Sequence, residues 1–249
     1  MSLVFSIVWV FIGCLFVCRA IDWLPVRFAE EESAIIADLL RRQDGRNWTE
    51  TPILSSSITS FISCPPTFSF TSLCYVSGAL LIAVWGYVIF GSSWNFFLWT
   101  AFGWVLVVLA VVDYQTQLLP DFLTLPMLWL GLVIQLFPET RTVGLELSVV
   151  GAIAGYLPLW VLAHAYRLIR GRDGLGMGDL KLLAAMGAWS GPFVLPQVLL
   201  LAALLAIALF VIERVLHRST AGIHEERPFG PAIVAAYFIV MAFEYLVSP

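Results

Sequence analysis

Charged residues are scarce in this chain. Lys, Arg, Asp and Glu make up 12% of its 249 residues, whereas hydrophobic residues make up 60%, compared with about 45–50% in a typical soluble domain. No soluble core of this length requires so much apolar surface, so the surrounding solvent must be lipid. The formal net charge is −4 and the basic residues form no stripe. This pattern argues against nucleic acid as a partner.

Several sequence motifs of enzymes and metal sites are missing. The chain contains no HExxH zinc motif, no GxSxG nucleophile motif, and neither of the phosphate-binding patterns GxxxxGK[ST] and GxGxxG. The four cysteines, Cys14, Cys18, Cys64 and Cys74, include no CxxC pair, so their spacing predicts no metal site. The chemistry of the chain is therefore expected to rest on other side chains.

Long apolar runs recur along the chain, and about 20 mostly apolar residues are enough to cross a bilayer as a helix. A membrane barrel would show alternating strands instead of long apolar blocks. We therefore expect an all-α polytopic membrane protein with about eight transmembrane helices. The predicted helices comprise residues 3–18, 74–91, 95–113, 121–137, 145–168, 179–190, 194–213 and 230–247.

The basic residues predict how these helices are oriented, because cytoplasmic loops are enriched in Lys and Arg. With both termini outside (N-out and C-out), twelve of the 13 basic residues are cytoplasmic and only Arg141 is outside. The chain then divides into a first transmembrane helix (1–18), a cytoplasmic loop (19–73) and a helical membrane domain (74–249). The predicted cytoplasmic residues are Arg19, Arg27, Arg41, Arg42, Arg46, Arg167, Arg170, Arg172, Lys181, Arg214, Arg218 and Arg227.

Two aspartates lie where this topology makes them unusual. Asp113 ends the third predicted helix and Asp179 begins the sixth, so both are expected at the cytoplasmic face. An acidic side chain within a membrane helix costs on the order of 2.5–3.5 kcal/mol at the centre and suggests a function. Two structural alternatives stay open. Asp113 can lie in interfacial water, and Asp179 can complement the dipole of its own helix.

A glycine-rich stretch precedes Asp179, with Gly174, Gly176 and Gly178 at alternate positions. Such a backbone lets an extended peptide approach closely. If Asp113 and Asp179 meet, they share one proton, because both cannot ionise cheaply. The ionised carboxylate then activates water, and the protonated one polarises a scissile carbonyl. This is the chemistry of an aspartic protease, which needs no metal and no cofactor.

Three motifs resemble those of the bacterial type IV prepilin peptidases, the GxGD class of membrane aspartic proteases. Asp113 is followed after four residues by LLPDFLTLP, which occupies positions 118–126. The sequence GMGD ends at Asp179 and continues with LKL, and PFGP begins at Pro228. The resemblance covers roughly residues 100–235 and makes 74–249 the peptidase domain. It implies Asp113 and Asp179 as the catalytic pair. It further implies an active-site loop set of Gly176, Gly178, Pro228 and Gly230.

The resemblance also implies partners and a location. The substrates would be prepilins or type II secretion pseudopilins, whose N-terminal leader is cleaved at the cytoplasmic face of the bacterial inner membrane. Many members of the family bind zinc through two CxxC pairs in the first cytoplasmic loop, which this chain lacks, so no metal is expected. S-adenosylmethionine would be needed only if methylation of the new N-terminus is retained. The oligomeric state is left open.

A membrane transporter or proton pathway that uses the same aspartates is the alternative function. It would require further polar residues inside the helices, and the fourth, seventh and eighth predicted helices have almost none. Two neighbouring charges are not assigned to catalysis. We expect Asp121 to cap the fourth helix, and Lys181 either to pair with an acid or to reach lipid phosphates.

Overall fold

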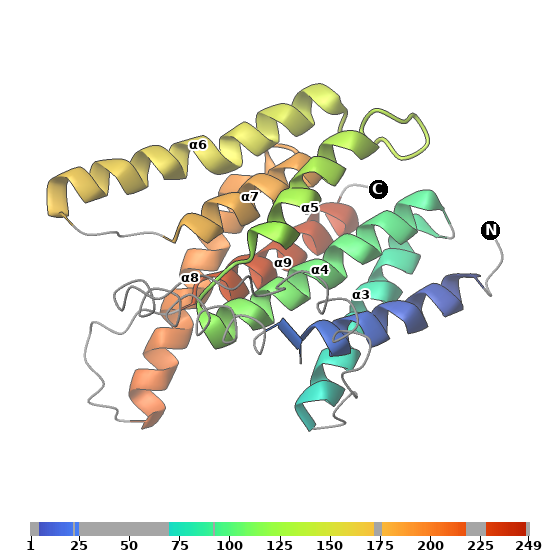
Figure 1. Cartoon of the computed structure of the whole chain (residues 1–249), viewed down its shortest axis with the longest axis horizontal. Coiled ribbons are helices and arrows are strands. Elements are labelled where there is room, and N and C mark those ends of the chain that lie inside the picture. The colour runs from blue at the N-terminus through green and yellow to red at the C-terminus, as the bar shows by residue number, and fades with distance from the viewer. Residues whose placement is uncertain are drawn as a thin grey trace, which may run out of the picture. The chain divides into compact units, whose positions relative to one another are not determined.

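The structure is a computed structural model that describes residues 5–21, 23–24, 70–91, 93–171, 176–217 and 228–247. Over these residues the regular secondary structure is helical, as Figure 1 shows, and this confirms the all-helical class. The chain falls into two compact units, Met1–Ser92 and Ser93–Pro249. The greater part of the predicted cytoplasmic loop lies outside the described residues.

The first unit contributes two apolar helices, Phe5–Ile21 and α3 (Phe70–Phe90). They correspond to the predicted helices 3–18 and 74–91. The α3 helix ends in a left-handed turn at Gly91 (φ 58°), whose amide donates to the carbonyl of Tyr87 at 2.9 Å. A glycine is favoured at this point because it adopts positive φ without steric cost.

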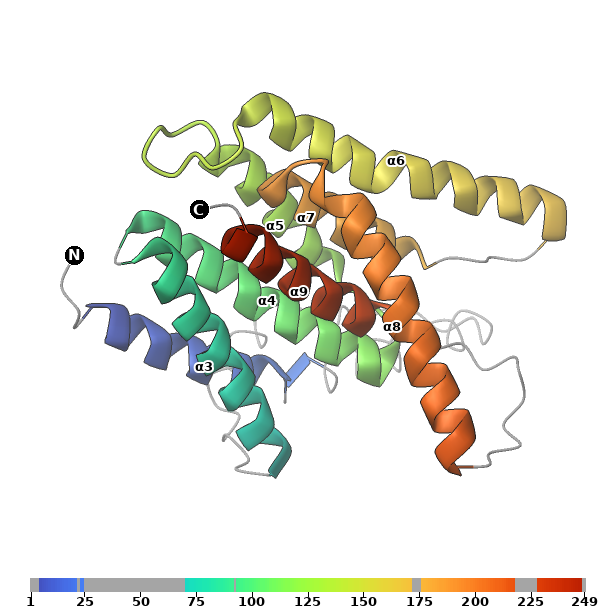
Figure 2. The ribbon, with the colours of Figure 1, turned by 180° about the vertical axis from the view of Figure 1, so that it is seen from behind.

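The second unit contains six helices over its described residues, and each lies within a few residues of its predicted position. The helix α7 packs against both α5 and α6, and α9 packs against both α4 and α8, as Figures 1 and 2 show from opposite sides. The helices of this unit are α4 (Trp94–Thr116), α5 (Asp121–Ile134), α6 (Leu145–Arg170), α7 (Met177–Ser190), α8 (Val194–His217) and α9 (Gly230–Val247).

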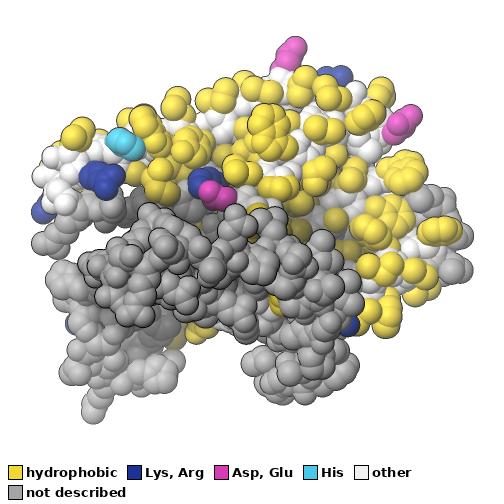
Figure 3. All heavy atoms as spheres, in the orientation of Figure 1, with side chains coloured by type: hydrophobic (Ala, Val, Ile, Leu, Met, Phe, Trp, Pro, Cys, Tyr) yellow, Lys and Arg dark blue, Asp and Glu magenta, His cyan; other side chains and the backbone are white. Residues whose placement is uncertain are grey.

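Three described helices are long and apolar enough to cross a membrane, namely Trp94–Thr116, Leu145–Arg170 and Val194–Ile212. Four others are apolar but shorter. Hydrophobic side chains also cover most of the described surface over α5 and α6, as Figure 3 shows, which suits a lipid environment. Eight complete spans and their orientation remain a prediction. The shorter apolar helices are Phe5–Ile21, Ser77–Phe90, Asp121–Ile134 and Gly230–Leu246.

The helix α7 differs from the others because it is short and almost wholly buried. It has 14 residues, a length of about 21 Å at 1.5 Å per residue, which is less than the roughly 30 Å of a hydrocarbon core. Every residue from Leu182 to Ser190 is buried. The greater part of α7, from Leu182 to Ser190, is therefore surrounded by protein, whereas α6 exposes much of its apolar surface.

Glycines allow α7 to approach α6 with the two backbones in contact. A Cβ atom on Gly151 would lie 2.1 Å from the carbonyl oxygen of Gly187, and one on Gly155 would lie 2.5 Å from that of Leu183. The Ser148 hydroxyl, one turn earlier on α6, donates to the carbonyl of Ala188. The four-residue spacing of Gly151 and Gly155 is the pattern by which membrane helices bring their backbones together.

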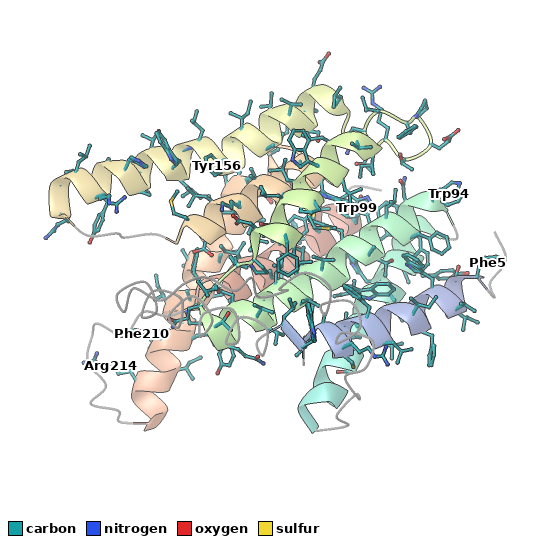
Figure 4. The ribbon with its side chains drawn as sticks, viewed as in Figure 1. Phe5, Trp94, Trp99, Tyr156, Phe210 and Arg214 are labelled. Atoms are coloured by element: carbon teal, nitrogen blue, oxygen red, sulfur yellow. The ribbon has the colours of Figure 1, made fainter. Side chains whose placement is uncertain are left out.

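An aromatic cluster fixes the other side of α7. The Trp189 ring stacks on Phe102 of α4, with centroids 4.2 Å apart, and its Nε1 donates to the Met127 carbonyl of α5 at 2.8 Å. Trp99, labelled in Figure 4, meets Trp189 edge to face at 5.6 Å, and Tyr237 of α9 meets Phe102 in the same way at 5.9 Å. These contacts set α7 relative to α4, α5 and α9.

Replacing Gly151 with alanine is expected to destabilise the second unit. The added methyl group would overlap backbone atoms of α7 that cannot rotate away, and overpacking of this kind costs about 1–3 kcal/mol. The measurement is the melting temperature of the purified protein in detergent. Gly78→Ala is the matched control, because a Cβ there meets nothing within 4 Å. Equal melting temperatures for Gly151→Ala and the unmodified protein would contradict the backbone contact.

Candidate active site

Asp113 lies in the last turn of α4 and is 5% exposed. Its backbone carbonyl accepts the amide of Gln117 at 2.8 Å, and this bond closes the helix. Gln117 has a φ of 56°, the one positive value among the described non-glycine residues. The helix therefore ends one turn beyond Asp113, and the chain turns toward α5 within four residues.

The carboxylate of Asp113 meets the start of α9. Its Oδ2 accepts a hydrogen bond from the backbone amide of Gly230 at 2.9 Å. Gly230 is the first residue of α9, where amides lack a partner within the helix and the dipole favours a negative charge. A Cβ atom on Gly230 would lie 2.6 Å from that oxygen, so glycine is required for this approach.

Asp179 lies in the first turn of α7 and is 8% exposed. Gly176 provides the extended N-cap residue, and its carbonyl accepts the amide of Asp179 at 3.2 Å. A Cβ on Gly178 would lie 2.7 Å from that of Leu119, so the connection between α4 and α5 lies directly on this turn. Of the predicted active-site loop, Gly176 precedes α7, where an added Cβ would lie 3.1 Å from Asp179 Oδ2, whereas Gly178 lies within the helix itself.

The two carboxyl groups lie close enough for the charge of Asp113 to act on Asp179. They are the only acidic side chains in the buried class within the part of the chain that the structure describes. Two such groups cannot both ionise cheaply, which favours a single shared proton. The arrangement can therefore supply one proton acceptor and one proton donor to a substrate placed between them.

Asp121 and Lys181 form an ion pair beside these carboxyl groups. The Lys181 Nζ donates to the Asp121 carboxylate at 2.5 and 2.7 Å, which joins the start of α5 to the first turns of α7. The expectation that Asp121 caps α5 is wrong. Pro120 is the N-cap residue, no side-chain capping bond forms, and Asp121 is instead the first residue of the helix. Its carboxylate turns to Lys181, so the lysine pairs with an acid.

For the remaining residues named from the sequence, the structure describes little or no contact with the two aspartates. Pro228 is half-buried and lies two residues before Gly230. Gly174 and Cys64 lie outside the described residues, as does the side chain of Cys74. Within the described ranges, no group of three or more His, Cys, Asp and Glu side chains is arranged to hold a metal ion. The contact of Gly151 and Gly155 with α7 was not predicted, although their four-residue spacing is a pattern that indicates close helix packing in membranes.

Comparison with known proteins matches residues 100–211 to the type IV leader peptidase family. That stretch contains Asp113 and Asp179 and ends before Gly230. A "Prepilin leader peptidase/N-methyltransferase" of Dickeya chrysanthemi is 46% identical over 127 residues, which are 51% of this chain and 44% of that protein. A protein of the same name from Neisseria gonorrhoeae is 36% identical over 203 residues, 78% of this chain and 66% of its own length.

A third relative with the same name, from Burkholderia pseudomallei strain 1026b, is 45% identical over 130 residues, or 52% of this chain and 41% of that protein. The chain spans about half the length of the curated relatives it matches. No solved structure matches the chain.

Proposed function

On the premise that this chain carries a domain of the type IV leader peptidase family over residues 100–211, we propose that it is a membrane aspartic endopeptidase. The substrates are type IV prepilins or type II secretion pseudopilins, and the bond cleaved joins the N-terminal leader to the rest of the substrate. Asp113 and Asp179 are the catalytic pair. Gly176 and Gly178 lie at the start of α7, and Pro228 and Gly230 at the start of α9, so the four surround the proposed pair from two helix beginnings.

The observation that supports this proposal is the burial of two carboxyl groups from separate segments, one within reach of the charge of the other. Asp113 comes from the end of α4 and Asp179 from the start of α7, and the charge of one acts on the other. A purely structural role explains neither their burial nor their proximity, because paired buried acids cost free energy unless they share a proton. The relatives named as prepilin leader peptidases support the same chemistry.

The reaction then follows the two protonation states of the pair. The ionised carboxylate removes a proton from water, and the water oxygen attacks the scissile carbonyl carbon. The protonated carboxyl gives its proton to the carbonyl oxygen, so that a neutral tetrahedral intermediate forms. In the second step the intermediate returns one hydroxyl proton to the carboxylate that had protonated the carbonyl oxygen. The leaving nitrogen takes the proton that the other carboxyl group had removed from water. The products are a carboxyl group and an amine.

The proposal is confined to cleavage. The relatives' names also include N-methyltransferase, but this chain contains no CxxC pair, and no step above requires a methyl donor. S-adenosylmethionine would be needed only if methylation of the product is retained. The proposed location is the bacterial inner membrane. The proposed divisions are a first transmembrane helix (1–18), a cytoplasmic loop (19–73) and a membrane peptidase domain (74–249).

Asp113→Asn and Asp179→Asn are each expected to reduce leader cleavage by at least about a hundredfold, because general acid and base chemistry is lost with either carboxyl group. The measurement is co-expression of each full-length variant with a candidate prepilin, followed by mass spectrometry of the product's N-terminus. This readout reports cleavage and methylation together.

The matched control for this experiment is Glu139→Gln, which removes an exposed carboxylate from the loop before α6. Exposed surface substitutions change stability little, so cleavage is expected to stay close to that of the unmodified protein. Cleavage that persists in Asp113→Asn or Asp179→Asn would overturn the catalytic assignment. Proton flux in liposomes without any peptidase activity would favour the alternative of a proton pathway.

The proposed eight-span orientation, with both termini outside, predicts opposite labelling of the two ends of α6. In a variant without the native cysteines, Glu139→Cys in the loop before α6 should react with a membrane-impermeant thiol reagent in intact spheroplasts. Arg170→Cys at the other end should react only after lysis. Both positions are exposed, so burial does not hide either thiol. The reverse pattern, or labelling of both from outside, would refute the orientation.

A further inference from the structure

The hydrogen bond between Asp113 and α9 bears on which carboxyl group performs which step. The proposed function leaves this open, and the present inference rests on that function. We propose that the backbone amide of Gly230 is a positioning group that keeps Asp113 as the ionised base that activates water, and thereby leaves the shared proton on Asp179.

The two acids differ in their hydrogen bonds. Asp113 Oδ2 accepts the Gly230 amide at 2.9 Å inside a buried site. No described residue donates a hydrogen bond to the Asp179 side chain, whose interaction with Asp113 is one of charge. Hydrogen bonds to an ionised acceptor are roughly twice as strong as those between neutral groups. The Gly230 amide therefore favours a negative charge on Asp113 over one on Asp179.

Helix dipoles do not make this distinction by themselves. Asp113 faces the N-terminus of α9, and Asp179 lies in the first turn of α7, so both experience the positive end of a helix. The difference is the directed N–H of Gly230. That contact depends on glycine, since a Cβ there would lie 2.6 Å from Oδ2 and 3.0 Å from Cγ of Asp113.

The charged groups nearby leave this asymmetry in place. Lys181 of α7 is engaged by Asp121 of α5 at 2.5 and 2.7 Å, so its charge is offset. On α9 the acid is Glu244, near the far end of the helix. The other titratable side chains on the described helices that pack against Asp113's helix are Asp179 on α7 and Tyr237 and Tyr245 on α9.

The second oxygen of Asp113 suits the role of base. Oδ1 receives no hydrogen bond from any described residue, whereas Oδ2 is occupied by Gly230. In the proposed first step Oδ1 takes one proton from water while the water oxygen bonds to the scissile carbon, and Asp179 gives its proton to the carbonyl oxygen. In the second step Asp179 recovers a proton from the intermediate, and Asp113 passes its own to the leaving nitrogen.

Replacing Gly230 by its α-hydroxy analogue tests the proposal directly. This backbone ester removes the N–H and adds no side-chain atom. The expected result is a roughly ten- to hundredfold fall in kcat/KM for a prepilin substrate, the range for one hydrogen bond to a charged group. The acidic limb of the pH profile should also move upward by about one unit or more, because Asp113 then keeps its proton to higher pH.

The matched control is the same ester at Ile233 in α9, which removes a helical bond to the Phe229 carbonyl at 3.1 Å and leaves Asp113 untouched. The Ile233 ester should lower the melting temperature and leave the acidic limb of the pH profile of kcat/KM unchanged. If the Gly230 ester does not fold, as judged by its melting temperature beside the Ile233 ester, Gly230→Ala replaces it in the same assay, since its methyl group displaces Oδ2 from the amide.

Three results would overturn the positioning role. The first is an acidic limb of the pH profile that does not move, at any level of activity, and the second is a kcat/KM equal to that of the unmodified protein. The third is complete loss of cleavage in a folded ester variant, since removing one hydrogen bond lowers kcat/KM by no more than about a hundredfold. Failure of the unmodified protein to cleave any prepilin would instead refute the proposed function, and the two failures are thereby separate.

Discussion

The structure depends on the cost of placing two carboxyl groups inside an apolar helical unit. Asp113 and Asp179 are 5% and 8% exposed, and the charge of Asp113 acts on Asp179. Such a pair is tolerated when a proton is shared and the remaining charge has a donor. The amide of Gly230 supplies that donor at 2.9 Å. This hydrogen bond joins the end of α4 to the start of α9, and the shared proton of the proposed pair would join α4 to the start of α7 as well.

Close backbone contact is what brings α7 to this position. Gly151, Gly155 and Gly187 let α6 and α7 touch without side chains between them, and Trp189 fixes the opposite side of α7 against α4 and α5. Because α7 is short and enclosed by protein, its first turn can present a polar group away from lipid. Packing along α7 therefore positions Asp179, the proposed catalytic acid in its first turn.

The sequence predicted the helices well because lipid demands long apolar runs, and their ends carry Gly, Pro and charged residues. That Asp113 and Asp179 share one membrane depth stays a prediction of the sequence. The sequence did not predict that Asp121 turns to Lys181, because a residue after Pro resembles a helix cap until its partner from 60 positions away is known. The role of the Gly230 amide could not be predicted either, because nearly every residue has a backbone N–H and the sequence does not show which of them donates to a given side chain.

The most direct test of the central claim is a distance between the two acidic positions in the membrane. In a full-length variant without native cysteines, Asp113→Cys and Asp179→Cys are combined, and crosslinking by a short homobifunctional thiol reagent is measured in isolated membranes. The convergence of α4 and α7 predicts an efficient intramolecular crosslink, with none when Glu139→Cys replaces Asp179→Cys. Absence of the 113–179 crosslink, in protein whose single cysteines both react with the reagent, would contradict it.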